Sequence, residues 1–242
     1  DYFLGHCLGS LSAVAAAAHH RRVRFGFDLE DFHEAETLEA ESNSRSLAAT
    51  RNLLRRHLPA AAHLTAASPL IAEAYERRYH VKSTVVLNVF PRDHAPDVPI
   101  KPGRLGQKRP AVLYWFSQTI GPGRGLEATV AILAQMRTPV ELHLRGYPAP
   151  GYAERLQALA THCRLRHPIV FLPSADPGEM VRLAADADLG LAMEESTPLN
   201  RTLCLTNKIF VYLLAGVPQL MSHTAAQAAL APELGCAAIL AR

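Results

Sequence analysis

The sequence predicts an α/β protein made of two Rossmann-like domains, each built on a parallel sheet. Two observations support this fold class. Short apolar runs alternate with helical periods in both halves of the chain, and a proline-rich stretch separates the halves. Strands that alternate with helices form a parallel sheet, and such sheets bind ligands beyond the carboxyl ends of their strands.

The first half carries four strand-like runs. A third helix begins at Ser68-Pro69. Serine can cap the helix, and proline suits the first helical position because the N–H that it lacks would have no partner within the helix. The predicted strands are residues 2–5, 23–28, 61–66 and 84–89, with the first two helices at residues 8–22 and 46–57.

The second half repeats the alternation with clearer helix signals. The segment from Asp176 to Glu179 offers a capping aspartate, a proline at the first helical position and a capping-box glutamate. The predicted strands are residues 111–116, 140–145, 169–172, 189–193, 219–222 and 237–240.

The stretch between the halves predicts a linker. It contains five prolines between residues 91 and 110 and few large apolar residues. We therefore expect domains at residues 1–92 and 111–242, joined by residues 93–110. The chain begins at Asp1 and ends just after a strand-like run, so we expect a fragment that lacks the start of the N-terminal domain and a closing C-terminal helix.

Composition excludes several classes of protein. The chain of 242 residues is 49% hydrophobic and 19% charged, which is typical of a globular protein. Its net charge of +3 does not indicate a nucleic-acid partner, and no apolar run is long enough to cross a membrane. The four cysteines, at positions 7, 163, 204 and 236, have no metal-ligand or disulfide-like spacing. This fits a reducing compartment, so we expect a cytoplasmic protein.

The most informative segment is residues 200–218. A polar, basic loop there runs into an apolar helix that ends in Gly216-Val217-Pro218. Thr206 or Asn207 can cap the helix, and Gly216 can take the left-handed position that ends it. The N–H groups and positive dipole end of such a helix suit a diphosphate.

A second segment has the chemistry of a phosphate site. The turn Gly121-Pro122-Gly123-Arg124-Gly125 follows the predicted strand at residues 111–116. Small residues let backbone N–H groups approach phosphate, and a guanidinium binds two oxygens at once. The alternative is a surface arginine in a flexible turn.

Four segments together resemble a known family. They are residues 27–34, 85–90, 117–127 and 200–218. The chain is similar over residues 25–218 to retaining nucleotide-sugar glycosyltransferases of the GT-B fold, the family-4-like group. This resemblance implies two Rossmann-like domains and transfer of a hexose from a nucleotide donor in bacterial polysaccharide or glycoconjugate biosynthesis. It implies a saccharide, lipid-linked or small-molecule acceptor, and no metal or other cofactor.

The resemblance also implies roles for individual residues. Arg124 and Lys208 match the basic residues that members of the family place against the donor diphosphate, and they stabilise the leaving group there. The implied donor-binding residues are Gly121, Gly123, Arg124, Gly125, Glu194, Glu195, Asn200, Arg201, Thr206, Asn207 and Lys208. For Lys208 and the two glutamates, a solvated surface position is the alternative.

The acceptor side is expected in the N-terminal half. His6 resembles a histidine that some relatives place near the reacting sugar, and we count it as catalytic. Asp31, His33 and Glu34 follow the strand at residues 23–28, where carboxylates and an imidazole could orient an acceptor hydroxyl. The alternative is an acidic, solvated helix start, and a metal site made of these acids and His33 is disfavoured.

One departure from the family concerns ribose recognition. Many members carry two glutamates at the positions that are Leu203 and Val211 here, and the second grips the ribose hydroxyls. Neither leucine nor valine can accept a hydrogen bond. The alternatives are that another acid binds the ribose, that the enzyme belongs to a subgroup with altered donor handling, or that donor binding is lost. Because the start of the N-terminal domain and the closing C-terminal helix are expected to be missing, a truncated or degenerate module that binds donor without turnover is the main alternative to an enzyme.

A minor alternative is an NADP-dependent oxidoreductase. The paired glycines Gly121 and Gly123 precede a helix, and Arg145 could bind a 2′-phosphate. The third glycine falls one position early, however, and Glu141 begins the next strand instead of ending it.

Overall fold

The computed structural model describes residues 1–37, 44–96 and 109–241. The chain forms two compact units. Unit 1 comprises Asp1–Asn88, Ser196–Leu205 and Thr224–Gln227, and unit 2 comprises Val89–Glu195, Thr206–His223 and Ala228–Arg242. Residues 97–108 of the predicted linker lie outside the described residues, and the predicted domain limits stay a prediction.

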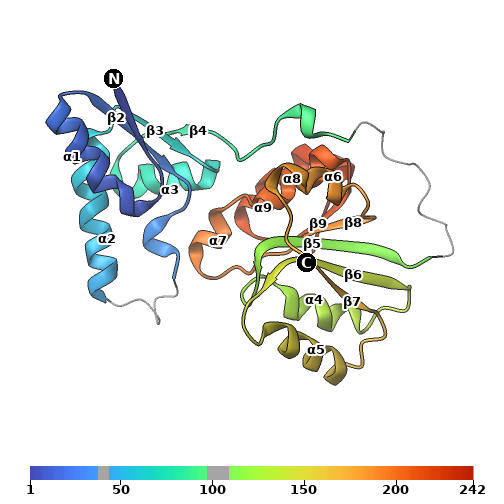
Figure 1. Cartoon of the computed structure of the whole chain (residues 1–242). Helices are drawn as coiled ribbons and strands as arrows, with labels where there is room; N and C mark the ends of the chain where they lie inside the picture. The colour runs from blue at the N-terminus through green and yellow to red at the C-terminus, as the bar shows by residue number, and fades with distance from the viewer. Residues whose placement is uncertain (38–43, 97–108, 242) are drawn as a thin grey trace. The chain divides into compact units, whose positions relative to one another are not determined.

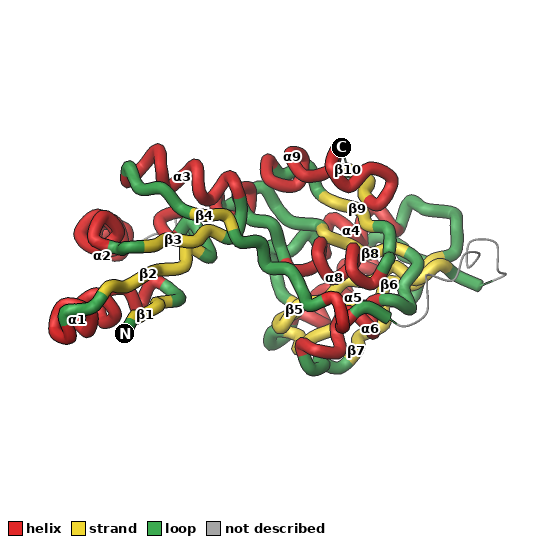
Figure 2. Tube along the Cα trace, turned by 90° about the horizontal axis from the view of Figure 1, so that it is seen from above, coloured by secondary structure: helices red, strands yellow, loops and turns green. Residues whose placement is uncertain are grey.

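Unit 1 contains a four-stranded parallel sheet in the order β1-β2-β3-β4 (Figure 2). The strands are β1 (Tyr2–Gly5), β2 (Arg24–Leu29), β3 (His63–Ala66) and β4 (Thr84–Val85). The helices are α1 (Leu11–Arg21), α2 (Ser44–His57), α3 (Pro69–Tyr79) and α7 (Leu199–Leu203). β4 is shorter than the predicted run at residues 84–89.

The core of unit 1 lies on one face of this sheet. Phe25, Phe27 and Leu29 of β2 and Leu64 and Ala66 of β3 are buried. They form one cluster with Leu11, Leu54, Ile71 and Leu203, which come from all four helices. The alternate residues Tyr2, Leu4, Arg24 and His63 are exposed. Among the described residues, the helices of unit 1 therefore cover a single face of its sheet.

Unit 2 contains a six-stranded parallel sheet in the order β10-β9-β8-β5-β6-β7. The strands are β5 (Ala111–Ile120), β6 (Val140–Pro148), β7 (Ile169–Leu172), β8 (Leu189–Ala192), β9 (Gln219–Met221) and β10 (Ala238–Leu240). The helices are α4 (Leu126–Leu133), α5 (Tyr152–His162), α6 (Met180–Ala184), α8 (Asn207–Ala215) and α9 (Ala225–Leu234), whose first residues belong to unit 1.

Both faces of the unit 2 sheet are packed. Figure 1 shows α4 and α5 on one side of the strands and α6, α8 and α9 on the other. Trp115 of β5 is fully buried in a cluster with α4. The next residue along β5, Phe116, makes an edge-on ring contact with Tyr212 of α8, at 5.7 Å between centroids. This two-faced packing matches the predicted fold class.

The helix ends follow the sequence signals in most places. Ser68 Oγ accepts a hydrogen bond from the backbone N of Ile71 at 3.1 Å, and Gly216 ends α8 with φ of 69°. Asp176 Oδ1 accepts from the backbone N of Gly178, but the cap begins a 3-10 turn that precedes α6. No helix of the described residues has the length and apolar character that a membrane span requires.

Besides β4, and β6, which continues beyond residue 145 to Pro148, two predicted segments differ from the structure. β5 continues to Ile120, so residues 117–120 extend the strand, with a register shift against β6 after Phe116. The loop predicted before α8 contains the short helix α7, and this segment belongs to unit 1.

Candidate functional site

The carboxyl edge of the unit 2 sheet brings two predicted segments together. β5 and β8 are adjacent parallel strands, so the turn after β5 and the residues after β8 lie at the same edge. Gly125 begins α4 with φ of 70°, and a Cβ atom added there would lie 3.2 Å from Cβ of Met193. Glycine is needed at this position for both its backbone conformation and its close contact.

Arg124 lies in this turn between two glycines with positive φ, Gly123 and Gly125. Its side chain is partly exposed and forms no hydrogen bond or ion pair with another described residue. A guanidinium in this state can bind an anion without first breaking a contact. The predicted phosphate contact of Arg124 stays a prediction, and no contact of its side chain with a described residue opposes it.

Lys208 and Glu194 form a buried ion pair in unit 2. Nζ of Lys208 donates to Oε1 of Glu194 at 2.9 Å, and the side chains are 6% and 2% exposed. The same Nζ lies 5.1 Å from the ring centroid of Trp115. A solvated surface position, one of the two alternatives for these residues, is wrong for both. Glu195 is exposed, and its predicted contact with the donor sugar stays a prediction.

This ion pair ties the first turn of α8, which contains Lys208, to the residue pair after β8. The backbone N of Glu194 also donates to Oγ of Ser222, which holds the backbone at the end of β8. Removing either partner of a buried pair leaves an uncompensated charge. Lys208 is thus held by Glu194, and its predicted contact with a diphosphate stays a prediction.

Thr206 occupies the capping position of α8 without capping it through its side chain. Its Oγ1 is buried and has no hydrogen-bond partner within the described parts of the chain. The expected side-chain cap is therefore wrong, whereas the expected start of the helix is confirmed. Asn207, the first residue of α8, is exposed.

Asn200 and Arg201 lie on α7 in unit 1, not on a loop of unit 2. Asn200 is buried, its Nδ2 donates to Oδ1 of Asp31 at 2.6 Å, and its Oδ1 accepts from the backbone N of Phe32 at 2.7 Å. Both ends of the amide are therefore used in holding α7 to the segment after β2. The predicted donor contacts of Asn200 and Arg201 stay predictions.

The acidic segment after β2 is tied into unit 1. Oε1 and Oε2 of Glu34 accept hydrogen bonds from Arg78, Arg51 and Tyr79. Burial, together with the hydrogen bond to Glu34, raises the pKa of Tyr79. The ring of His33 is buried, and its Nδ1 pairs with Glu36. The solvated acidic face considered as an alternative is wrong for Glu34.

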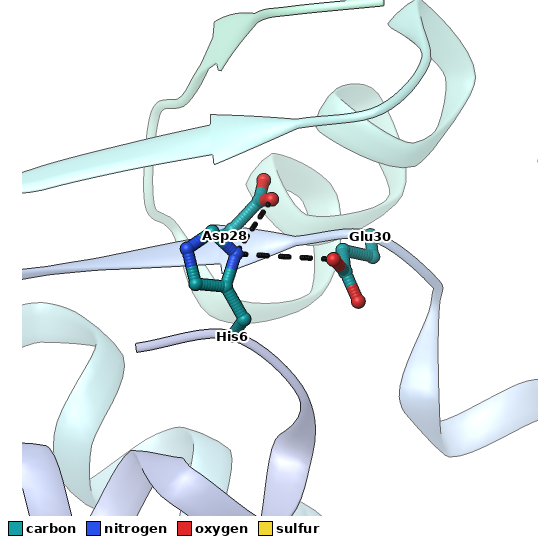
Figure 3. Close-up of side chains that lie close together, drawn as sticks. All are labelled: His6, Asp28 and Glu30. Carbon is teal, nitrogen blue, oxygen red and sulfur yellow. Dashed lines mark hydrogen bonds and ion pairs between the residues drawn. The ribbon is translucent and has the colours of Figure 1, made fainter. Parts of the chain in front are cut away.

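His6 is the predicted acceptor-side residue that remains open. It follows β1, its side chain is 52% exposed, and two carboxylates face its ring (Figure 3). Nδ1 of His6 lies 3.2 Å from Oδ2 of Asp28 and 3.8 Å from Oε1 of Glu30. Oδ1 of Asp28 accepts a hydrogen bond from Oγ1 of Thr65 at 2.6 Å.

The cluster of His6, Asp28 and Glu30 has ligand atoms that all lie within 4.8 Å of one another. An imidazole and two carboxylates suit a divalent transition metal. The negative charge of Glu30, followed by desolvation, raises the pKa of the thiol of the adjacent Cys7. The expectation that no metal takes part stays a prediction.

The sequence reasoning missed the pairing of Asp28 with His6 and of Glu194 with Lys208. A signal for the first existed, because His6 follows one predicted strand, Asp28 ends the next, and neighbouring parallel strands have their carboxyl ends at the same edge of a sheet. No signal existed for the second pair, whose members are separated by 14 residues and a segment of unit 1.

Three further residues bear on the alternatives. Val211 is fully buried in α8, and Leu203 is buried in the core of unit 1. Nε of Arg145 donates to the hydroxyl of Tyr114, and a second guanidinium nitrogen donates to the carbonyl of Pro173, both at 2.8 Å. These contacts use the guanidinium that an NADP enzyme would need for a 2′-phosphate.

Comparison with known proteins identifies the fold. HepE from Anabaena, solved in complex with UDP, superposes with a TM-score of 0.75 and 22% identity, over 100% of this chain and 64% of that one. Sucrose-phosphate synthase from Thermosynechococcus elongatus superposes with a TM-score of 0.73 and 17% identity, over 99% of this chain and 60% of that one. TarM from S. aureus, with UDP bound, superposes with a TM-score of 0.59 and 10% identity, over 89% of this chain and 40% of that one. No protein-family model matches the sequence, and no curated protein matches it significantly.

These likenesses show that the chain has the two-sheet GT-B fold of glycosyltransferases, as the sequence resemblance implies. The chain spans about 60–64% of the length of HepE and of sucrose-phosphate synthase.

Proposed function

We propose that this chain belongs to a glycosyltransferase that moves a sugar from a nucleotide-diphosphate donor to an acceptor hydroxyl. The observation that carries the proposal is the meeting of two phosphate-binding features at one edge of the unit 2 sheet. The glycine turn with the unpaired Arg124 follows β5, and α8 begins beside the end of β8, where Lys208 contacts Glu194. Both features supply positive potential and N–H groups.

The neighbouring structures support the donor class. HepE has been solved with UDP-glucose, and TarM with UDP. A UDP-sugar is therefore the first donor to test. The GT-B fold gives the NADP alternative no support, and the contacts of Arg145 argue against it.

In the proposed reaction, the acceptor oxygen forms a bond to the anomeric carbon while the bond from that carbon to the phosphate oxygen breaks. The electron pair leaves with the nucleoside diphosphate, and a phosphate oxygen of that leaving group takes the proton of the acceptor hydroxyl. Arg124 and the first turn of α8 stabilise the charge that develops there, and the pair of Lys208 and Glu194 holds that turn in place. His6 is proposed as an acceptor-side group from the sequence resemblance. Retention at the anomeric carbon is proposed from the sequence resemblance.

Other parts of the proposal rest on the sequence. The four cysteines are free thiols, which fits a cytoplasmic protein in a reducing compartment. We place the reaction in bacterial polysaccharide or glycoconjugate synthesis, with a saccharide, lipid-linked or small-molecule acceptor. The reaction uses the nucleotide-sugar as co-substrate and requires no metal.

A donor-binding module without turnover is the second candidate. The observation in its favour is Val211, whose apolar side chain stands buried where many family members have the ribose-binding glutamate. Acceptor-dependent release of UDP from UDP-glucose supports the transferase. Saturable binding of UDP-glucose without any release supports the module, and absence of binding to UDP-, GDP- and ADP-sugars contradicts both.

Arg124→Ala tests the donor site directly. We expect it to weaken UDP binding by about 1.5–3 kcal/mol and to leave uridine binding nearly unchanged, because the guanidinium contacts phosphate alone. Isothermal titration with the two ligands measures the difference. Arg137→Ala, at an exposed arginine elsewhere in unit 2, is the matched control. Equal losses for UDP and uridine would refute the assignment of Arg124.

A further inference from the structure

Three metal-ligating side chains gather at the carboxyl ends of β1 and β2. His6 follows β1, Asp28 lies near the end of β2, and Glu30 follows that strand (Figure 3). Their ligand atoms all lie within 4.8 Å of one another, and the described residues contain no other group of this kind. All three residues belong to unit 1, so the geometry of the cluster does not depend on unit 2.

The separations between these atoms suit a single ion. Nδ1 of His6 lies 3.2 Å from Oδ2 of Asp28 and 3.8 Å from Oε1 of Glu30. Zinc binds nitrogen and oxygen at about 2.0–2.2 Å, so neighbouring ligand atoms of a tetrahedral site lie about 3.3–3.6 Å apart. The first separation is slightly shorter than this range and the second slightly longer. Glu30 has a 41% exposed side chain, which leaves it free to adjust.

Two of the three ligands are held in place by neighbouring residues. The hydroxyl of Thr65, the register partner of Asp28 on β3, donates to Oδ1 at 2.6 Å and leaves Oδ2 toward the imidazole. Oγ of Ser10 donates to the carbonyl oxygen of His6 and so fixes the backbone from which the ring extends. Outer hydrogen bonds of this kind orient the ligands of metal sites.

The ligand set favours a divalent transition ion. Mg²⁺ and Ca²⁺ take oxygen ligands, so an imidazole nitrogen among the ligands disfavours both. Zn²⁺ binds imidazole nitrogen and carboxylate oxygen alike. The imidazole of His6 is 52% exposed, so water can complete the coordination.

We propose that His6, Asp28 and Glu30 form a zinc site in unit 1. The ligands are Nδ1 of His6, Oδ2 of Asp28 and a carboxylate oxygen of Glu30, and water takes the remaining position. The transfer reaction proposed above requires no metal, and the zinc site does not depend on that proposal. The competing interpretation is an ion pair without affinity for metal. In that case Nδ1 carries a hydrogen, because an ionised carboxylate can only accept one.

Isothermal titration with zinc chloride tests the site on the whole chain after treatment with chelator. We expect one ion per chain in the tightest step. His6→Ala should weaken this step by more than about 100-fold, whereas Thr65→Val, which removes an outer hydrogen bond, should weaken it by about 10- to 100-fold. Asp28→Asn and Glu30→Gln keep the side-chain size and should also weaken it. His63→Ala, at an exposed histidine on the same face of the sheet, is the matched control and should bind zinc as the wild type does.

NMR identifies the ligand atom. In the chain labelled with ¹⁵N-histidine, long-range ¹H–¹⁵N spectra distinguish hydrogen on Nδ1 from hydrogen on Nε2. We expect hydrogen on Nδ1 of His6 without zinc, where the carboxylates face that nitrogen, and on Nε2 once zinc has taken the lone pair of Nδ1. The spectrum of His63 should not change during the same step.

The outcomes decide between a zinc site and a simple ion pair. The proposal is overturned if zinc does not bind saturably, if the tightest step survives in His6→Ala, or if zinc leaves the His6 spectrum unchanged. Displacement of the zinc by an equal concentration of magnesium chloride overturns the choice of ion. Amide hydrogen exchange of unit 1 checks that each variant is folded. If Asp28→Asn unfolds, Glu30→Gln at the more exposed position decides, and a wild-type affinity there counts against the site.

Discussion

The two sheets of this protein differ in how they are covered. The unit 2 sheet packs apolar residues on both faces, whereas the described helices of unit 1 cover one face of its sheet. Parallel sheets are normally buried on both faces. The difference shows in the side chains: the uncovered face of unit 1 carries the polar, partly exposed Asp28 and Thr65, whereas the covered face carries the core. The same difference makes specific predictions about stability.

The largest effects are expected in unit 2, on both faces of β5. Trp115→Ala and Phe116→Ala should each lower the free energy of unfolding by about 3–5 kcal/mol, because each leaves a cavity in a packed layer. Urea denaturation, with hydrogen exchange mass spectrometry to assign the loss to unit 2, measures both. A cost near zero for either variant would mean that one face of this sheet is not packed.

A matched pair of leucines tests unit 1. Leu64, on the covered face, is 4% exposed, whereas Leu4, on the uncovered face, is 50% exposed. Leu64→Ala should cost about 2–5 kcal/mol, and Leu4→Ala less than about 1 kcal/mol. The same denaturation experiment compares them. Equal costs would show that the second face is covered in solution and would remove the contrast between the sheets.

Asn200→Ala tests whether α7 is part of unit 1. The substitution leaves the N–H of Phe32 without its partner, so unit 1 should lose about 1–3 kcal/mol. Hydrogen exchange should quicken near Phe32 and stay unchanged in β8. Asn207→Ala, at an exposed site in unit 2, serves as the control. If exchange quickens in unit 2 instead, α7 has been assigned to the wrong unit.

The smallest expected effects come from helix caps in the two units. Oγ of Ser68 accepts from Ile71 and donates to the carbonyl of Leu203, so Ser68→Ala should cost about 1–2 kcal/mol. Asp176 makes a comparable cap on an exposed turn of unit 2, and Asp176→Ala should cost about 0.5–1 kcal/mol. Thermal denaturation of both variants compares the two losses of stability. A larger loss for Asp176→Ala than for Ser68→Ala would contradict the prediction.

Local signals predicted most of the fold. The strands follow from short apolar runs, and the ends of α3 and α8 follow from Ser68 and Gly216, because these features depend on neighbouring residues. The extension of β5 to Ile120 was missed, since Ser117, Gln118 and Thr119 are polar. Pairing with β6, a long-range effect, makes them a strand.

The candidate site was predicted less completely, because its contacts join residues that are distant in sequence. The sequence places Glu194 at a strand end and Lys208 at a helix start, but it contains no signal that the two meet as a buried pair. Asn200 was assigned to the loop before α8 and to the donor site, whereas its amide bonds to residues of unit 1. Burial of a charged or polar side chain is a property of the tertiary structure, and the periodicity of apolar residues along the sequence does not predict it.

The assignment of α7 to unit 1 has a consequence for the order in which the protein is made. Phe32 and Asn200, which hydrogen-bond to each other, are 168 residues apart in the sequence. At about 5–20 residues per second, a ribosome needs on the order of 10 to 30 seconds to synthesise that stretch. Unit 1 therefore emerges first but is completed late, and a gene divided after residue 92 would express it without the segment that binds Phe32 and Ser68.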